Sequence, residues 1–268
     1  TYYRGIEYLN INNGQFTHYN KSTVPSLPSN QTWTVLDGGD NNLYIGHVGS
    51  GFSIFSLKDK SVKNFQNETG NPASLPGNDV FCIIKDTNGN IWLGTNNGLA
   101  LYNAANENFI TFRNNKNDKY ATLCSRILSI RQLKDNRLWI ASELNGIAIL
   151  NLKQGMFLSP EELSIEYIQE GDDSRSLSNA SARCIFQDSF DNVWIGTWGG
   201  GINFISSKPP LFTTLSYSPI PNNENSLNNK VASSLCMDRQ GRVWIPVLLN
   251  QKQTSKALKD MRQLLKPS

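Results

Sequence analysis

Few side chains in this sequence are able to do chemistry. It contains two His and four Cys. The Cys are widely spaced, without a Cys-x-x-Cys pair, so neither a His-based metal site nor a zinc or thioredoxin motif is indicated. Asp86, Asn88 and Asn90 alternate as ligands do in a calcium loop, but the Glu that closes such a loop is missing. Because Asp and Asn cap turns through their own backbone, we expect a turn here, with no metal and no cofactor.

Glycoside hydrolysis is the enzymatic alternative, and it needs two carboxylates facing each other about 5–9 Å apart. Candidate acids in the loops are Asp79, Glu143 and Asp172 or Asp173. The residue pairs that begin four apolar strands are Asp79-Val80, Ser125-Arg126, Ala182-Arg183 and Lys230-Val231. Of these four pairs, the first alone contains an acidic residue, Asp79. We therefore expect a domain without catalysis, and a glycoside hydrolase or lyase remains an alternative.

Ligand binding is better supported than catalysis, by polar and aromatic residues in loops that share one face. The candidate contact residues are Trp198, Arg126, Arg183, Asn78, Asp79, Asn96, Asn97, Glu143, Asn145 and His47. An exposed Trp among amides, two Arg and a carboxylate suits a polar, partly flat ligand such as a sugar. The two Arg also suit the carboxylate or sulfate of an acidic glycan. Trp198 is the most informative of the set, because its equivalents Asn96 and Glu143 are polar.

The composition excludes several classes of protein. The chain has 268 residues, of which 38% are hydrophobic and 18% charged, so it is neither a disordered tail nor a coiled coil. The net charge is +3 and the basic residues are scattered, which does not indicate nucleic-acid binding. No apolar run approaches the ~18 residues of a membrane helix, so we expect no membrane contact by this segment. The sequence begins at Thr1, and a removed signal peptide would not be visible.

Internal repeats determine the expected fold. Five segments align on a short turn followed by an aromatic strand, and their aromatic residues are Tyr44, Trp92, Trp139, Trp194 and Trp244. These recur every 47 to 55 residues, close to the period of about 40–50 for a four-stranded propeller blade. Because the aromatic recurs in every repeat, we expect it to pack between neighbouring blades rather than to stack on a ligand.

One repeat shows how each is expected to fold. In the second, the expected strands are Val80–Lys85, Ile91–Thr95, Leu99–Tyr102 and Asn108–Arg113, separated by turns rich in Asn and Gly. The predicted fold is an all-β propeller of four-stranded antiparallel blades over residues 1–249. Its blades cover about 21–69, 70–117, 118–172 and 173–222, and a composite fifth joins 223–249 with 1–20.

The two ends of the chain carry separate expectations. Joining the half-repeats at the two ends would close the ring and remove exposed sheet edges; the alternative is a fragment of a seven-bladed propeller. Residues 250–268 place apolar side chains on one helical face. The tail is read as a docked or frayed helix, with a partner-binding helix or a segment foreign to the repeats as alternatives.

Two of the repeats, DTNGNIWLGTNNGLALYN (86–103) and DSFDNVWIGTWGGGINFI (188–205), together with the linker NPASLPGNDVFCI (71–83), resemble the two-component regulator propeller repeat. The resemblance implies the extracytoplasmic, periplasmic sensor part of a hybrid histidine kinase, notably of gut Bacteroidetes that sense polysaccharide fragments. The partners it implies are an oligosaccharide and a second copy of the protein in a homodimer. The oligosaccharide would be acidic if Arg126 and Arg183 bind it. Such sensors usually carry more repeats, an immunoglobulin-like domain, a membrane helix and a kinase, none of which occurs here. A protein-binding scaffold is the remaining alternative.

Overall fold

The structure is a computed structural model that describes residues 3–112, 120–152, 164–173, 175–208, 236–240 and 242–244. The chain divides into two compact units, Thr1–Lys208 and Pro209–Ser268. The predicted linker to the last repeat and the predicted helical tail at 250–268 lie outside the described residues. Among the described residues, no helix is long and apolar enough to cross a membrane.

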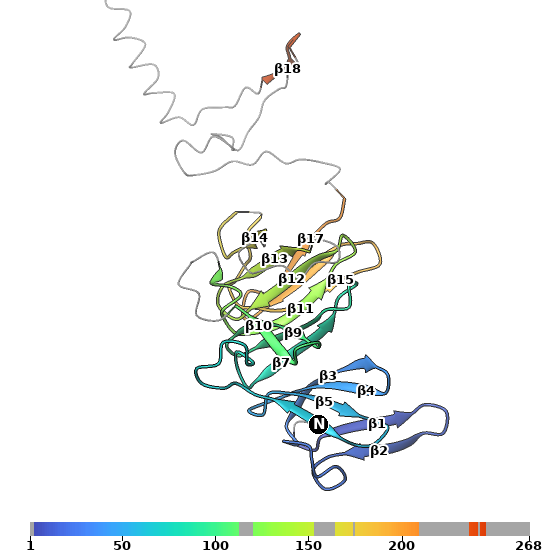
Figure 1. The fold of residues 1–268 in the computed structure, drawn as a ribbon. Coiled ribbons are helices and arrows are strands. Elements are labelled where there is room, and N and C mark those ends of the chain that lie inside the picture. The colour runs from blue at the N-terminus through green and yellow to red at the C-terminus, as the bar shows by residue number, and fades with distance from the viewer. Residues whose placement is uncertain are drawn as a thin grey trace, which may run out of the picture. The chain divides into compact units, whose positions relative to one another are not determined.

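The first unit contains three complete sheets of four antiparallel strands, as the repeat pattern predicts (Figure 1). The first sheet contains β3 (Thr32–Gly39), β4 (Asn42–His47), β5 (Phe52–Ser56) and β6 (Val62–Phe65). The second contains β7 (Val80–Lys85), β8 (Ile91–Thr95), β9 (Gly98–Asn103) and β10 (Asn108–Thr111). The third contains β11 (Ile127–Gln132), β12 (Arg137–Ser142), β13 (Ile147–Asn151) and β14 (Ile165–Ile168). Each sheet is a meander in chain order, which confirms the all-β propeller class.

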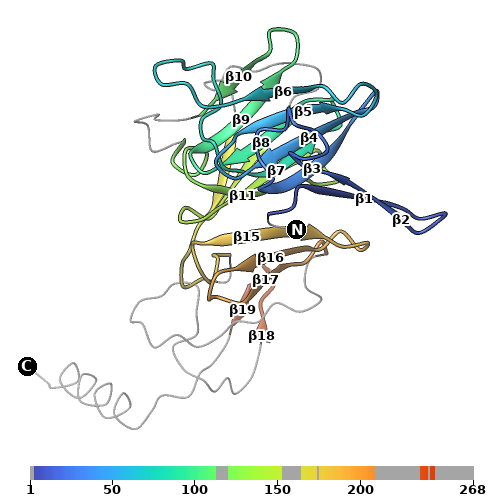
Figure 2. The ribbon, with the colours of Figure 1, turned by 90° about the horizontal axis from the view of Figure 1, so that it is seen from below.

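The remaining described strands belong to smaller sheets. A fourth sheet has three described strands, β15 (Ala182–Gln187), β16 (Val193–Thr197) and β17 (Ile202–Ile205). A hairpin of β1 (Ile6–Asn10) and β2 (Gln15–Tyr19) forms a separate two-stranded sheet (Figure 2). In the second unit, β18 (Cys236–Met237) pairs with β19 (Val243–Trp244).

The hairpin β1–β2 contacts the first sheet as the third strand of one sheet contacts the next. The amide of Gly5 donates to the carbonyl of Asn30 at 2.9 Å. Equivalent bonds join Gly51 to Asn78 at 2.8 Å and Gly146 to Ala180 at 2.9 Å. The hairpin therefore has the surroundings of the last two strands of a blade. The composite blade, the blade boundaries and the total of five blades stay predictions.

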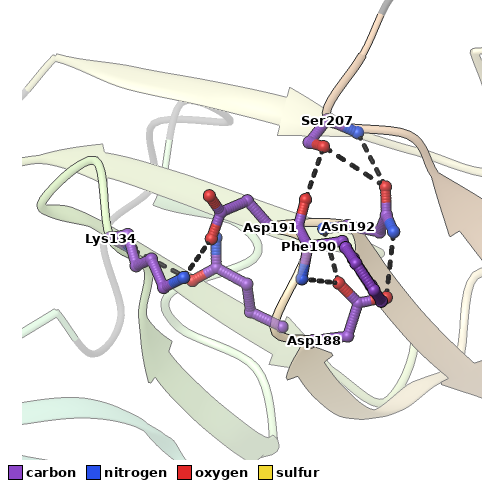
Figure 3. Close-up of polar contacts among 7 residues, drawn as sticks. Lys134, Asp188, Phe190, Asp191, Asn192 and Ser207 are labelled. Carbon is purple, nitrogen blue, oxygen red and sulfur yellow. Dashed lines mark hydrogen bonds and ion pairs between the residues drawn. The ribbon is translucent and has the colours of Figure 1, made fainter.

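In the second and fourth sheets, the Asp that begins the first hairpin turn ties the turn to the aromatic strand. Asp86 Oδ1 accepts the amides of Asn88 and Asn90, each at 2.9 Å, and its Oδ2 accepts the indole N–H of Trp92 at 2.9 Å. Asp188 holds the corresponding turn of the fourth sheet through the amides of Phe190 and Asn192 (Figure 3), and it also accepts the indole N–H of Trp194 at 3.0 Å. These carboxylates are satisfied by their own turns, as the interpretation as turn chemistry requires.

Two of the second-strand aromatics, Trp92 and Trp139, are buried in clusters that join neighbouring sheets. The side chains of Trp92 and Trp139 are 3% and 4% exposed, and Tyr44 is half-buried against Phe52 with ring centroids 5.7 Å apart. Trp92 lies in a core cluster with residues of the third sheet such as Ile140, which buries a large flat area between blades. Trp194 is partly exposed, and the side chain of Trp244 lies outside the described residues.

Candidate functional site

The first strand of each of the four larger sheets in the first unit carries an irregularity at the same place. The pairing register shifts between Thr32 and Thr34, between Val80 and Cys82, between Ile127 and Ser129, and between Ala182 and Cys184. The residues set aside by the four shifts are Trp33, Phe81, Leu128 and Arg183. A β-bulge leaves one residue unpaired and re-aims its side chain. Because β3, β7, β11 and β15 contact one another in succession, the four bulges bring a variable residue of each sheet to one common edge.

Aromatic rings and a guanidinium meet at the start of this edge. Trp33 and Phe81 lie edge to face, with ring centroids 5.7 Å apart and planes at 83°. The guanidinium carbon of Arg126, which comes just before β11, lies 4.9 Å from the centroid of Phe81. Side chains of three consecutive sheets are thus in contact, each through a stacking or cation–π geometry.

The contacts continue through a carboxylate to the fourth sheet. Glu143, in the loop after β12, accepts Nη1–H of Arg126 at 3.1 Å and Nη2–H of Arg183 at 3.4 Å. The guanidinium carbon of Arg183 lies 4.4 Å from the ring centroid of Trp198. We call this set the cross-blade row: Trp33, Phe81, Arg126, Glu143, Arg183 and Trp198.

The cross-blade row is half open to solvent. Trp198 is 68% exposed and Trp33 is 51% exposed, so both rings offer apolar surface at the edge of the row. Arg stacked on an exposed aromatic ring contributes roughly 0.5–1 kcal/mol, and an exposed ion pair contributes roughly 0–1 kcal/mol. The row is therefore ordered by several weak contacts. It suits reversible binding of a ligand that combines a flat face with hydrogen-bonding groups.

Four of the sequence-predicted residues hold the linker before the second sheet. Asn78 Oδ1 accepts the amide of Asn67 at 2.7 Å, and Asp79 Oδ1 accepts the amide of Gly49 at 2.7 Å. Asn96 Oδ1 accepts the amide of Asp79 at 3.2 Å, and Asn97 Nδ2 donates to the carbonyl of Pro76 at 3.0 Å. The hydrogen bonds described for these four residues are with the linker and neighbouring loops. The residues therefore lie next to the cross-blade row and are not part of it.

Asn145 follows Glu143 in the same loop and is half-buried. Its backbone amide is bound by Ser142 Oγ at 3.0 Å, and its carbonyl accepts from Thr122 Oγ1 at 2.9 Å. These bonds fix the backbone of the loop that carries Glu143. The structure therefore places Asn145 beside the cross-blade row, where it shapes the loop.

His47 lies at the same end of the first sheet as Trp33, but its side chain is buried in the sheet rather than exposed in a loop, so the structure does not present it to a ligand as predicted. It is the last residue of β4 and pairs with Thr32, the position that Thr95 and Thr197 occupy in their sheets. Its side chain is 0% exposed, and its Nε2 lies 2.9 Å from Ser53 Oγ. Burial lowers the pKa of His47 from 6.5 to about 4, because the charged imidazolium loses its hydration.

Sequence reasoning missed Trp33 and Phe81. A signal was available, because Trp33, Phe81, Leu128 and Arg183 each stand eleven residues before the second-strand aromatic of their repeat. That alignment marks one repeat position whose residue type changes from blade to blade. The alternation of apolar and polar residues does not reveal the bulges that expose this position. A bulge adds one residue to a strand without changing the residue types around it.

The row offers a poor arrangement for acid–base catalysis. Its carboxylate is Glu143, which two guanidiniums already bind, whereas hydrolysis needs an opposed pair. Nowhere in the described part of the chain do three His, Cys, Asp or Glu side chains gather as a metal site would require.

A hollow of about 490 Å³ lies away from the cross-blade row, at the turn end of the third and fourth sheets. Polar groups along it bond one another (Figure 3). Lys134 pairs with Asp191, and Ser207 Oγ donates to the carbonyl of Phe190 at 2.7 Å. Because these polar groups already bond one another, they are less available to bind a ligand than the exposed rings of the cross-blade row.

Comparison with known proteins identifies the repeats. The model of the two-component regulator propeller family matches residues 74–97 and 176–199. Over 92 residues, a third of its length, the chain is 33% identical to Histidine kinase P4 of Formosa agariphila and covers 7% of it.

Solved structures extend the likeness to nearly the whole chain. The extracellular domain described as that of the hybrid two component system BT3049 from B. thetaiotaomicron is 59% identical over 91% of this chain, with a TM-score of 0.66. The corresponding domain of BT4673 is 19% identical over 90%, with a TM-score of 0.57, and shows the fold alone. The chain covers 29% of each of these two structures, so it spans under a third of their length. These regulatory relatives agree with the expectation of a domain without catalysis of its own. Two segments of the chain therefore match the two-component regulator propeller repeat, and over most of its length the chain is similar to the extracellular domain of a two-component system.

Proposed function

We propose that this chain is part of the extracytoplasmic sensing propeller of a hybrid two-component system, and that it binds oligosaccharide fragments at the cross-blade row. The sensing role is supported by the match to the regulator propeller family and by the 59% identity to a two-component extracellular domain. A periplasmic location is part of the same proposal.

The observation that carries saccharide binding is the exposed indole of Trp198, 68% exposed and stacked on one side by Arg183. A flat apolar ring beside fixed hydrogen-bond donors fits the alternation of C–H and O–H groups on a sugar. Trp33 offers a second exposed ring at the other end of the row, which suits an oligosaccharide better than a single sugar.

Signalling would follow from linkage. A ligand that binds one arrangement of the sensor better than another shifts the population toward it by the difference in affinity. We propose a homodimer as the unit whose two arrangements the ligand distinguishes.

The test is thermal unfolding of the 268-residue chain against a library of plant and host oligosaccharides, followed by calorimetric titration of those that stabilise it. A ligand at one hundred times its Kd stabilises the folded state by about 2.7 kcal/mol. Trp198→Ala should weaken binding about tenfold, while the matched control Phe190→Ala should not. Phe190 is 75% exposed and lies at the other end of β16. No stabilisation by any member of the library, or equal weakening in both variants, contradicts the proposal.

A further inference from the structure

We propose that Arg126 and Arg183 together bind an anionic group of the ligand, a carboxylate or a sulfate ester, and that Glu143 occupies its position in the free protein. The inference rests on the proposed function, because it assumes that the ligand is a saccharide at the cross-blade row. It gives Glu143 the role of a competitor that the ligand displaces, and thereby makes it a specificity-determining residue.

Glu143 accepts one N–H donor from each of the two guanidiniums. One N–H of Arg126 reaches Oε2 at 3.1 Å, and one N–H of Arg183 reaches Oε1 at 3.4 Å, which is long. An Arg carries five N–H donors in a planar fork that matches a carboxylate through two parallel bonds. In addition, Nε of Arg183 is buried and has no hydrogen-bond partner among the described residues. The pair can therefore bind a better-placed anion more strongly than it binds Glu143.

The aromatic stacks keep the guanidiniums in place without help from Glu143. Arg126 lies over Phe81 at 4.9 Å, and Arg183 lies over Trp198 at 4.4 Å. Stacking on a ring orients the guanidinium plane and leaves its edge donors free. The two Arg can therefore stay in place when Glu143 is displaced. If the ion pairs were purely structural, losing Glu143 would disorder both Arg.

The charge balance favours an anion. Two cations share one carboxylate in the row, and the nearby Asp79 binds the amide of Gly49 rather than either Arg. Glu143 stands next to Leu144, which is 72% exposed, so its loop lies at the surface and the side chain can turn to solvent. Exposed ion pairs are weak, and their loss is small beside a bidentate bond to a ligand anion.

The test compares Glu143→Gln with wild type by calorimetric titration, using oligosaccharides of matched length that are neutral, uronate-containing or sulfated. We expect Glu143→Gln to raise the affinity for an anionic oligosaccharide, relative to that for a neutral one of the same length, about three- to fivefold. Arg126→Gln should weaken anion binding at least about tenfold. The uronate and sulfate arms show which anion the site takes.

The matched control is Glu166→Gln, which removes the same charge at the opposite end of β12. Glu166 pairs with Arg137 there and is 55% exposed on its side chain. This variant should leave every affinity unchanged, which separates local competition from net charge. Weaker anion binding by Glu143→Gln would make Glu143 a positioning residue and overturn the inference. Binding of neutral oligosaccharides alone overturns it while the proposed function stands, and binding of none refutes the proposed function itself.

Discussion

Arg183 lies over the indole of Trp198, with its guanidinium carbon 4.4 Å from the ring centroid. The two residues come from facing ends of β15 and β16, where Ala182 pairs with Thr197. The bulge after Ala182 sets Arg183 aside from the ladder, and Trp198 is the first residue after β16. A local irregularity of the sheet therefore produces the stack at one end of the cross-blade row.

Intrinsic fluorescence should report this stack directly. A saccharide that covers Trp198 removes water from its exposed ring, so ligand binding should shift part of the emission to shorter wavelength. Trp198→Phe should abolish most of that shift, whereas Trp92→Phe should retain it, because Trp92 is buried between sheets. A ligand-induced shift of equal size in both variants would place the ligand elsewhere.

Asp86 should be a stability residue of the second sheet. Its carboxylate is 5% exposed and accepts four bonds at 2.9 Å, from two amides, the Asn90 side chain and Trp92. Asp86→Ala leaves those donors unpaired and should lower the free energy of unfolding by about 2–4 kcal/mol. The measurement is urea unfolding.

Asp135 is the natural control for Asp86. In the third sheet this Asp binds Arg137 at 2.7 Å instead of the indole of its repeat, and the side chain is 46% exposed. Asp135→Ala should therefore cost less than about 1 kcal/mol. If the two variants lose the same stability, the bond to the Trp indole is not what holds the turn.

Much of the fold was predictable because strand patterns and turn chemistry agree in each repeat. In the second repeat, Val80–Lys85 and Ile91–Thr95 are both predicted and observed, and the third strand, Gly98–Asn103, extends one residue past each predicted end. The turns at Asp and Asn-Gly fix where the strands of this repeat begin and end. The regular recurrence of Trp likewise indicates packing between blades.

The site was less predictable, since it depends on features without a local sequence signal. His47 follows a Gly and precedes a turn, so it reads as a loop residue; the ladder with β3 instead places it inside the sheet. Phe81 reads as a core residue of an apolar strand, and the bulge turns it toward Arg126. Arg126, Glu143, Arg183 and Trp198 were predictable because charge and an isolated Trp depart from the repeat.

The glycines of the second strands test whether a further blade follows the fourth sheet. A Cβ on Gly94 would lie 2.5 Å from Cys82 Sγ and 2.7 Å from Ile127 of the next sheet, and one on Gly46 would meet Val80 of the next sheet at 2.8 Å. Gly94→Ala should therefore cost about 1–3 kcal/mol through overpacking.

Gly196 occupies the same position in the fourth sheet, and a Cβ there would meet Cys184 Sγ at 2.7 Å, a residue of its own sheet. If another blade covers this sheet, as the predicted ring requires, Gly196→Ala should cost about as much as Gly94→Ala in urea unfolding. A much smaller loss for Gly196→Ala would contradict a following blade.

The buried imidazole of His47 should make the first sheet sensitive to acid. In the unfolded chain this His takes up a proton near pH 6.5, whereas burial lowers the pKa in the folded chain to about 4. Between these values the unfolded state binds more protons, so stability is complete above pH 6.5 and falls as the pH decreases toward 4. The loss attributable to His47 is roughly 3 kcal/mol.

Two variants isolate this contribution from that of the carboxylates. His47→Thr introduces the residue found at the equivalent positions 95 and 197, and His47→Gln keeps an N–H able to reach Ser53. Neither titrates between pH 4 and 7, so both should show a shallower fall in the free energy of unfolding, measured in urea at pH 7, 5.5 and 4.5. Equal slopes for wild type and both variants would mean that protonated His47 is accommodated in the folded sheet, and that its burial carries no acid sensitivity.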